Sequence, residues 1–299
     1  MDSSLRRGSL EMVAAMLISG TIGWFVLVSG QSVLDVVFWR CVFGTGTLLV
    51  ICAAFGFLKP GVITRTAFLL AIASGVAIVG NWVLLFASYS RASIAIGTAV
   101  YNVQPFLLVG LAVVFLGEKI TVAKVTWLSV AFLGMLAIVS AHGAGQGSGE
   151  EYLVGIALAL GAAFLYATAA LIIKRLNGTP PHLIALIQVA TGVMLLAPWV
   201  KLGGLPGEPS ALASLVTLGM VHTGLMYVLL YSAIQRLPTA LTGALSFIYP
   251  IAAILVDWVA FGHRLAPLQW LGVALILLAA AGMQQGWWFR SAPIIVKGQ

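Results

Sequence analysis

Polar and aromatic side chains lie inside long apolar runs of this chain, away from the ends of those runs. They supply indole, amide, phenol, imidazole and hydroxyl groups, and they are Trp24, Asn81, Trp82, Tyr101, Asn102, Tyr166, His222, Ser246 and Tyr249. Such groups can bind a small neutral or zwitterionic solute, because a few polar groups orient its head while aromatic rings contact its apolar part. The set holds no Lys, Arg, Asp or Glu, which a densely anionic or strongly cationic solute would need.

Each of these residues also has a purely structural interpretation, which we keep open. A lone histidine such as His222 can join two helices, and serines such as Ser246 commonly bond to a helix backbone. The stripe formed by Thr223, Tyr227 and Tyr231 could line a cavity or pack on a neighbouring helix.

The sequence contains no recognised catalytic or metal-binding motif. The patterns His-Glu-x-x-His, Gly-x-Ser-x-Gly and Gly-x-x-x-x-Gly-Lys are missing, so we expect no catalytic residue, no metal, no cofactor and no ATP hydrolysis. The two cysteines, Cys41 and Cys52, fall in one apolar run. We expect both to be buried core residues rather than a disulfide or a metal site.

The composition requires a membrane around most of the chain. Of 299 residues, 61% are hydrophobic and 8% are charged, and the mean hydropathy is +1.09. A soluble domain carries roughly 25% charged residues, so a water-soluble fold is excluded. The net charge of +7 would suggest nucleic acid only if the cations gathered on one exposed face.

Apolar runs of about 20 residues predict an all-α protein with ten transmembrane helices. We expect these near residues 10–29, 33–57, 67–90, 94–116, 122–140, 153–175, 181–200, 211–235, 239–261 and 267–289. Short connections make consecutive helices antiparallel neighbours.

Most loop cations fall on one side of the membrane when alternate loops are assigned to the same side. That side holds Arg6, Arg7, Lys59, Arg65, Lys119, Lys124, Lys174, Arg175, Arg236, Arg290 and Lys297, and the other holds Arg91, Lys201 and Arg264. The positive-inside rule then predicts an inner-membrane protein with both termini in the cytoplasm. This distribution explains the basic charge without a nucleic-acid partner.

Arg40 is the one cation inside a predicted helix. Counted from the helix ends, Arg40 and Asp257 lie at comparable depths near the outer face. They could pair, or Arg40 could extend to the interface, and we predict a structural role for both.

The two halves of the sequence are related by an offset of 145 positions. Arg91, Pro105, Gly117 and Lys119 fall on Arg236, Pro250, Gly262 and Arg264, and Trp82 and Phe86 fall on Tyr227 and Tyr231. The sequence therefore predicts a first five-helix repeat over 1–142, a Gly-rich linker over 143–150 and a second repeat over 151–299. Because each unit has an odd number of helices, the second is inverted, which favours a site between the repeats and transport by alternating access.

Pro105 and Pro250 fall near the centres of their predicted helices, at equivalent positions. Proline removes a backbone hydrogen bond and bends a helix, so both residues could act as hinges. A static kink that improves packing is the alternative.

Several of these features together resemble a known family. Phe38-Trp39-Arg40, Pro105 followed by Gly117-Glu118-Lys119, and Pro250 followed by Gly262-His263-Arg264 resemble EamA-type members of the drug/metabolite transporter superfamily, most of all the YddG-type amino-acid exporters. His263 departs from this pattern, since the first copy has Glu118.

The resemblance implies an exporter of aromatic and other apolar amino acids, with a small-molecule substrate and the lipid bilayer as its partners and no ATPase subunit. An exporter of other drugs or metabolites, a passive channel and an intramembrane enzyme of unrecognised type are the alternatives. The oligomeric state stays open, because spacings such as Ser19-x-x-x-Gly23 are common in membrane helices.

Overall fold

The computed structural model describes residues 3–92, 97, 100–140, 150–200, 205–261 and 267–285, and within them it contains helices and no β-strand. The helices are α1 (Ser3–Ser19), α2 (Ile22–Ser29), α3 (Val33–Ala54), α4 (Arg65–Ala92), α6 (Gln104–Leu116), α7 (Val122–Ser140), α8 (Glu150–Arg175), α9 (Pro181–Leu196), η1 (Ala197–Trp199), α10 (Pro209–Gly219), η2 (Met220–Leu225), α11 (Met226–Arg236), α12 (Thr239–Ser246), α13 (Ile248–Phe261) and α14 (Pro267–Gln285). The prediction of an all-α protein is confirmed for the described residues.

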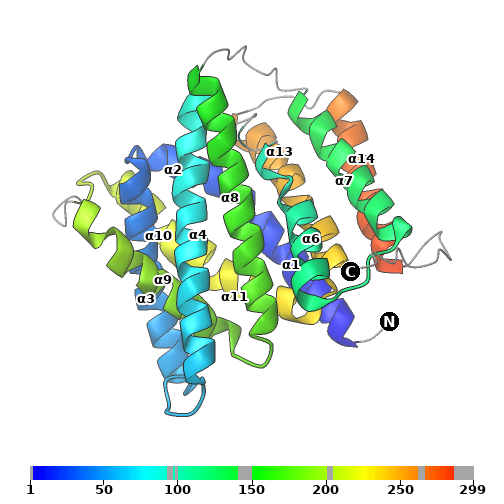
Figure 1. Cartoon of the computed structure of the whole chain (residues 1–299). Coiled ribbons are helices and arrows are strands. Elements are labelled where there is room, and N and C mark those ends of the chain that lie inside the picture. The colour runs from blue at the N-terminus through cyan, green and yellow to red at the C-terminus, as the bar shows by residue number, and fades with distance from the viewer. Residues whose placement is uncertain are drawn as a thin grey trace.

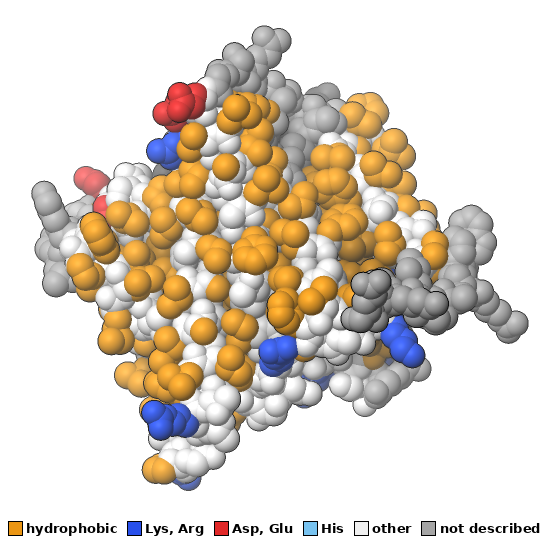
Figure 2. Space-filling view, in the orientation of Figure 1, with side chains coloured by type: hydrophobic (Ala, Val, Ile, Leu, Met, Phe, Trp, Pro, Cys, Tyr) orange, Lys and Arg blue, Asp and Glu red, His pale blue; other side chains and the backbone are white. Residues whose placement is uncertain are grey.

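Six helical stretches among the described residues are long and apolar enough to cross a membrane. They are Ser3–Val26, Val33–Ala54, Arg65–Tyr89, Glu150–Arg175, Pro181–Trp199 and Pro209–Arg236. Shorter apolar helices cover Gln104–Leu116, Val122–Ala137, Thr239–Ala252 and Trp270–Met283. Large apolar side chains face outward, as Met194 (80% exposed) and Val114 (74% exposed) do, and Figure 2 shows them spread over the surface. Such a surface is stable against lipid and not against water.

Several predicted helices are interrupted where we expected continuous ones. The first divides at Gly20 and Thr21 into α1 and α2, and the helix predicted over 94–116 breaks at Asn102 and Val103 before α6 begins. The run predicted over 239–261 divides at Phe247 into α12 and α13.

The two prolines explain the breaks before α6 and within 239–261. Pro105 is the second residue of α6, and Pro250 is the third residue of α13. Proline costs nothing in the first turn of a helix, because the amide protons there have no intrahelical partner. Both prolines therefore begin new helices, where we predicted bends in the middle of old ones.

Two long helices, α4 and α8, lie side by side through the middle of the molecule (Figure 1). On one side of them α3 packs against α9 and α10, and on the other α7 pairs with α14. The main apolar core includes the buried thiols Cys41 and Cys52, as predicted. A second apolar cluster around Met135 and Phe247 joins α7 and α14 to α12.

Ion pairs lie at the two ends of the long helices. At the C-terminal end of α4, Arg91 Nε lies 3.2 Å from Glu151 Oε2 on α8. At the opposite end of α8, Lys174 Nζ lies 3.0 Å from Glu118 Oε1. Figure 2 shows Lys and Arg side chains mainly at one end of this face, with apolar side chains between the ends.

Candidate functional site

A short π-helix holds His222. Residues Met220–Leu225 form this segment, η2, between α10 and α11. Two side chains donate to backbone carbonyls in or beside this segment: Thr223 Oγ1 donates to Leu218 O at 2.8 Å, and Arg40 Nη2 donates to His222 O at 3.4 Å. Because π-helical turns are rare and are frequently found at functional sites, this segment marks a candidate site.

Arg40 extends from α3 into the space between α4 and η2. Its guanidinium carbon lies 4.1 Å from the ring centroid of Trp82, and its Nε donates to Thr223 Oγ1 at 3.1 Å. Trp82 Nε1 in turn donates to the Tyr227 hydroxyl at 2.8 Å, and the two rings meet edge to face. We call Arg40, Trp82, His222, Thr223 and Tyr227 the arginine cluster.

The arginine cluster corrects two expectations from the sequence. We predicted Arg40 near the outer face, apart from the candidate site, whereas it contacts Trp82 and the backbone of His222. We also predicted a site without charge, whereas this candidate cluster contains the guanidinium of Arg40. The side chain of Asp257 lies outside the described residues, and its helix α13 packs on α1, α7 and α14 while α3 packs on α4, α9, α10 and η2.

His222 joins the π-helix to the break between α1 and α2. Its Nε2 lies 2.6 Å from Thr21 Oγ1, and its Nδ1 lies 3.3 Å from Thr217 O. The Nδ1 tautomer donates to the Thr217 carbonyl, while the Thr21 hydroxyl beside Nε2 donates to Ile18 O at 2.8 Å. The imidazole ring also lies 5.0 Å from the ring of Phe25. Predicted site residue Trp24 is 37% exposed, and its ring meets that of Phe25 edge to face with centroids 4.7 Å apart.

A second group of predicted residues, Asn81, Tyr101 and Tyr166, joins α4 and α8. Asn81 Nδ2 donates to Ala162 O at 2.8 Å, and Asn81 also shares a side-chain hydrogen bond with Tyr101. The rings of Tyr101 and Tyr166 meet edge to face with centroids 6.2 Å apart. Asn102 is buried at the break before α6. We call Asn81, Tyr101 and Tyr166 the tyrosine cluster.

The other predicted residues lie outside the two clusters as defined, and one of them bonds only within its own helix among the hydrogen bonds of the described residues. Ser246 Oγ donates to Gly243 O of its own helix at 2.7 Å, as in the structural interpretation of such serines. Tyr249 hydrogen bonds to Tyr89. Pro105 packs where Gly243 leaves room, since a Cβ on that glycine would lie 3.1 Å from the Pro105 Cβ.

Comparison with known proteins decides the family. The EamA-like transporter family matches residues 6–140 and again residues 153–284. This chain belongs to the EamA-like transporter family. The resemblance drawn from the sequence is confirmed, and the protein is a multi-pass membrane transporter rather than an enzyme.

Several known proteins are similar to this EamA-like transporter in sequence or in fold. It is 30% identical over 273 residues to the uncharacterized transporter YxxF of Bacillus subtilis (strain 168), an alignment that covers 91% of this chain and 88% of that protein. It is 29% identical over 195 residues to a probable terminal-alkyne amino-acid exporter of Streptantibioticus cattleyicolor, with 65% and 64% of the two chains covered. A crystal structure with 20% identity superposes with a TM-score of 0.77, over 92% of this chain and 95% of that one, and supports the fold.

The structure of the transporter adds Gln188, which sequence reasoning missed, as a partner of Tyr231. Tyr231 donates from its hydroxyl to Gln188 Oε1, and Gln188 Nε2 donates to Ser74 Oγ at 2.7 Å. The ring of Tyr231 lies 5.2 Å from that of Tyr227. Tyr227 contacts Trp82 on α4 and Tyr231 contacts Gln188 on α9, so this stripe packs against both helices. An amide in the middle of the predicted helix 181–200 was a signal of the kind that selected Asn81, and it could have identified Gln188.

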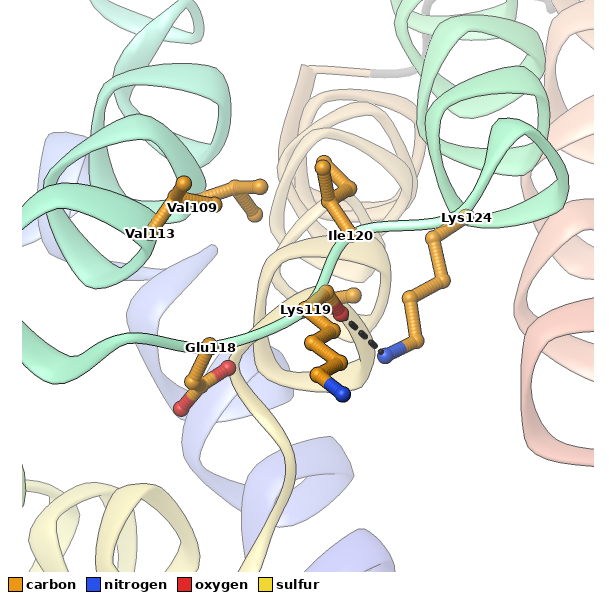
Figure 3. Close-up of a pocket in the computed structure, with 7 residues that line it drawn as sticks. Val109, Val113, Glu118, Lys119, Ile120 and Lys124 are labelled. Atoms are coloured by element: carbon orange, nitrogen blue, oxygen red, sulfur yellow. Dashed lines mark hydrogen bonds between the residues drawn. The ribbon is translucent and has the colours of Figure 1, made fainter. Parts of the chain in front are cut away.

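A small pocket of the transporter lies at the connection between α6 and α7, away from both clusters (Figure 3). Its volume of about 10 Å³ holds one water molecule at most, which excludes an amino acid. Lys124 Nζ donates to Lys119 O at 3.1 Å beside it. Glu118 on its rim pairs with Lys174 and accepts from Thr239 Oγ1 at 2.6 Å. Burial alone would raise the pKa of Glu118, but Thr239 and Lys174 together hold it below the usual 4.5.

Proposed function

We propose that this transporter exports small zwitterionic solutes, above all aromatic and other apolar amino acids, from the cytoplasm across the inner membrane. The observation that carries the proposal is the arginine cluster, which combines polar groups with the aromatic rings of Trp82 and Tyr227 inside an apolar helical protein. An amino acid has the matching parts, a polar head and an apolar side chain. The relative named as a probable amino-acid exporter supports the same substrate class.

The proposed mechanism is alternating access between two inverted five-helix repeats, over 1–142 and 151–299, with the Gly-rich segment 143–150 between them. The family matches the chain twice, over 6–140 and over 153–284. Trp82 and Tyr227, which the offset of 145 makes equivalent, hydrogen bond to each other. Equivalent residues related by a two-fold axis meet only near that axis, so this bond supports a pseudo-two-fold axis through the arginine cluster.

A second pair of contacts supports the inverted repeat. Gly219 packs so closely on Phe43 that a Cβ on the glycine would lie 2.3 Å from the Phe43 Cβ. At the offset of 145, Gly219 corresponds to Ser74 in the first half, and Phe43 corresponds to Gln188 in the second half. Gln188 Nε2 donates to Ser74 Oγ at 2.7 Å, so these two equivalent positions are also in contact. The contact between α3 and α10 thus has its counterpart between α9 and α4.

The two halves have different backbone conformations at one pair of equivalent segments, as expected if one repeat unit can adopt two conformations. Residues 220–225 form the π-helix η2, whereas the equivalent residues 75–80 lie within the regular helix α4. The helix breaks beside Pro105 and Pro250 provide equivalent points at which each half could bend. We infer that the halves exchange these conformations when the site opens to the other side, with the prolines as hinges.

The orientation follows from charge. Ion pairs of Arg7 and Arg236 with Glu11 lie at the same end of the helices as the pair of Lys174 with Glu118. The alternation of loops in the sequence assigns most loop cations to this same side. The positive-inside rule therefore favours both termini in the cytoplasm.

A competition experiment tests the proposal. Protein in proteoliposomes should take up labelled phenylalanine, and unlabelled aromatic and branched amino acids should compete better than glutamate or lysine. Asn81→Ala, Tyr101→Ala and His222→Ala should reduce uptake at equal protein content, whereas Lys59→Gln, in an exposed loop, should not. Full uptake by all three variants of the two clusters would overturn the site, and equal competition by every amino acid would overturn the substrate class.

A further inference from the structure

Within the described part of the chain, the groups that contact the Arg40 guanidinium are all uncharged. Its side chain is buried, with the whole residue 1% exposed, and its contacts are a hydroxyl, a backbone carbonyl and the face of an indole. The ion pairs of the described residues lie at the helix ends and involve other cations, namely Arg7, Arg91, Lys174 and Arg236.

A charge in that position is costly. Removing a guanidinium from water in the middle of an apolar protein costs several kcal/mol, and neutral hydrogen bonds recover only part of it. An intramembrane cation without a carboxylate is therefore more stable when an anion binds beside it. The sequence repeat makes the position asymmetric, because the residue equivalent to Arg40 is Ala185.

We propose that Arg40 binds the carboxylate of the transported solute. The proposal rests on the proposed function and sharpens its substrate class to solutes that carry a carboxylate next to an apolar group. An amine that lacks the carboxylate is excluded by the same cation, because its ammonium group would meet a like charge.

Arg40 has N–H donors that its hydrogen bonds within the described residues do not use. A guanidinium has five N–H donors, and the hydrogen bonds of Arg40 use Nε and Nη2. The guanidinium lies over the ring of Trp82, with its central carbon 4.1 Å from the ring centroid. A carboxylate therefore binds at the edge, where the planar fork of donors matches its two oxygens. The indole of Trp82 and the phenol of Tyr227 then lie beside the bound head, in position to contact an apolar side chain.

Three probes of equal ring size test this assignment by calorimetry on the detergent-purified full chain: phenylalanine, 3-phenylpropionate and phenethylamine. Phenylalanine and 3-phenylpropionate should bind, and phenethylamine should bind at least about tenfold more weakly, since a charge-assisted hydrogen bond contributes that much. Arg40→Gln keeps N–H donors for the neighbouring oxygens but removes the charge. It should weaken 3-phenylpropionate binding about 10- to 100-fold. Lys59→Gln is the matched control for loss of one cation, because Lys59 lies in an exposed loop.

The outcomes separate this inference from the proposed function. If 3-phenylpropionate binds through Arg40 but phenylalanine is not transported, the carboxylate site stands and amino-acid export fails. If phenylalanine is transported and Arg40→Gln binds 3-phenylpropionate as tightly as the wild type, the carboxylate site fails and export stands. Equal affinity of the wild type for phenethylamine and 3-phenylpropionate also overturns the inference, and this comparison needs no variant to fold. Absence of binding by all three probes would overturn both.

Discussion

Replacing Gly219 with alanine should separate the π-helix from α3. A Cβ at this position would lie 2.3 Å from the Phe43 Cβ and 2.9 Å from the Gly44 backbone nitrogen. Ordinary contact begins at 3.4 Å, so the two backbones must move apart by about 1.1 Å. Thr223 lies one turn further on, and the same movement would lengthen its 3.1 Å hydrogen bond from Arg40.

The expected cost of this overpacking is about 1–3 kcal/mol, which corresponds to a fall in Tm of about 2–10 °C. Thermal unfolding of detergent-purified protein, followed by loss of the monodisperse chromatographic peak, measures it. Gly46→Ala on α3 and Gly110→Ala on α6 are matched controls, because a Cβ at either position meets nothing within 4 Å. A Gly219→Ala variant as stable as these controls would refute the close packing of η2 on α3.

Three further predictions concern the pH dependence of stability, the Trp82–Tyr227 hydrogen bond near the proposed pseudo-two-fold axis, and the membrane topology. The pKa of Glu118 is lowered in the folded protein, so the stabilisation from its pair with Lys174 is complete above pH 4.5 and is lost as the pH falls through that lower pKa. Tm should therefore drop on acidification below pH 4.5 and should drop less in Glu118→Gln. Trp82→Phe and Tyr227→Phe each lose the 2.8 Å hydrogen bond, so in a thermal double-mutant cycle they should show a coupling of about 1 kcal/mol, and additive effects would contradict that bond. In a chain without its two cysteines, an impermeant maleimide should label Glu208→Cys from outside intact cells but Lys59→Cys only after permeabilisation, and the reverse pattern would invert the topology.

The sequence predicted much of the helical framework, because the length of an apolar run is a property of the run itself. The helix predicted over 122–140 has the bounds of α7, and the one predicted over 33–57 begins with α3 at Val33. The π-helix was not predicted, because no pattern within its own residues indicates it, and its contacts include Arg40, which is 183 positions from Thr223 in the chain. The breaks beside the prolines were predicted as bends, since a proline signals an irregularity without determining its form.

The sequence identified individual residues of the candidate site but not which of them contact one another. Polarity at membrane depth selected Asn81 and His222, and both make hydrogen bonds between segments. Arg40 was misplaced because depth was counted along its helix, whereas its long side chain reaches beyond its own turn to Trp82. Which helices face one another depends on packing, and no single run of sequence contains that information.

Counterflow in proteoliposomes tests the central claim, alternating access by an amino-acid carrier, most directly. Vesicles loaded with unlabelled phenylalanine should take up external labelled phenylalanine faster than empty vesicles and should accumulate it transiently above its external concentration. A carrier with one site that faces each side in turn requires this trans-stimulation. Uptake at the same rate into loaded and empty vesicles would contradict the account and indicate a passive channel.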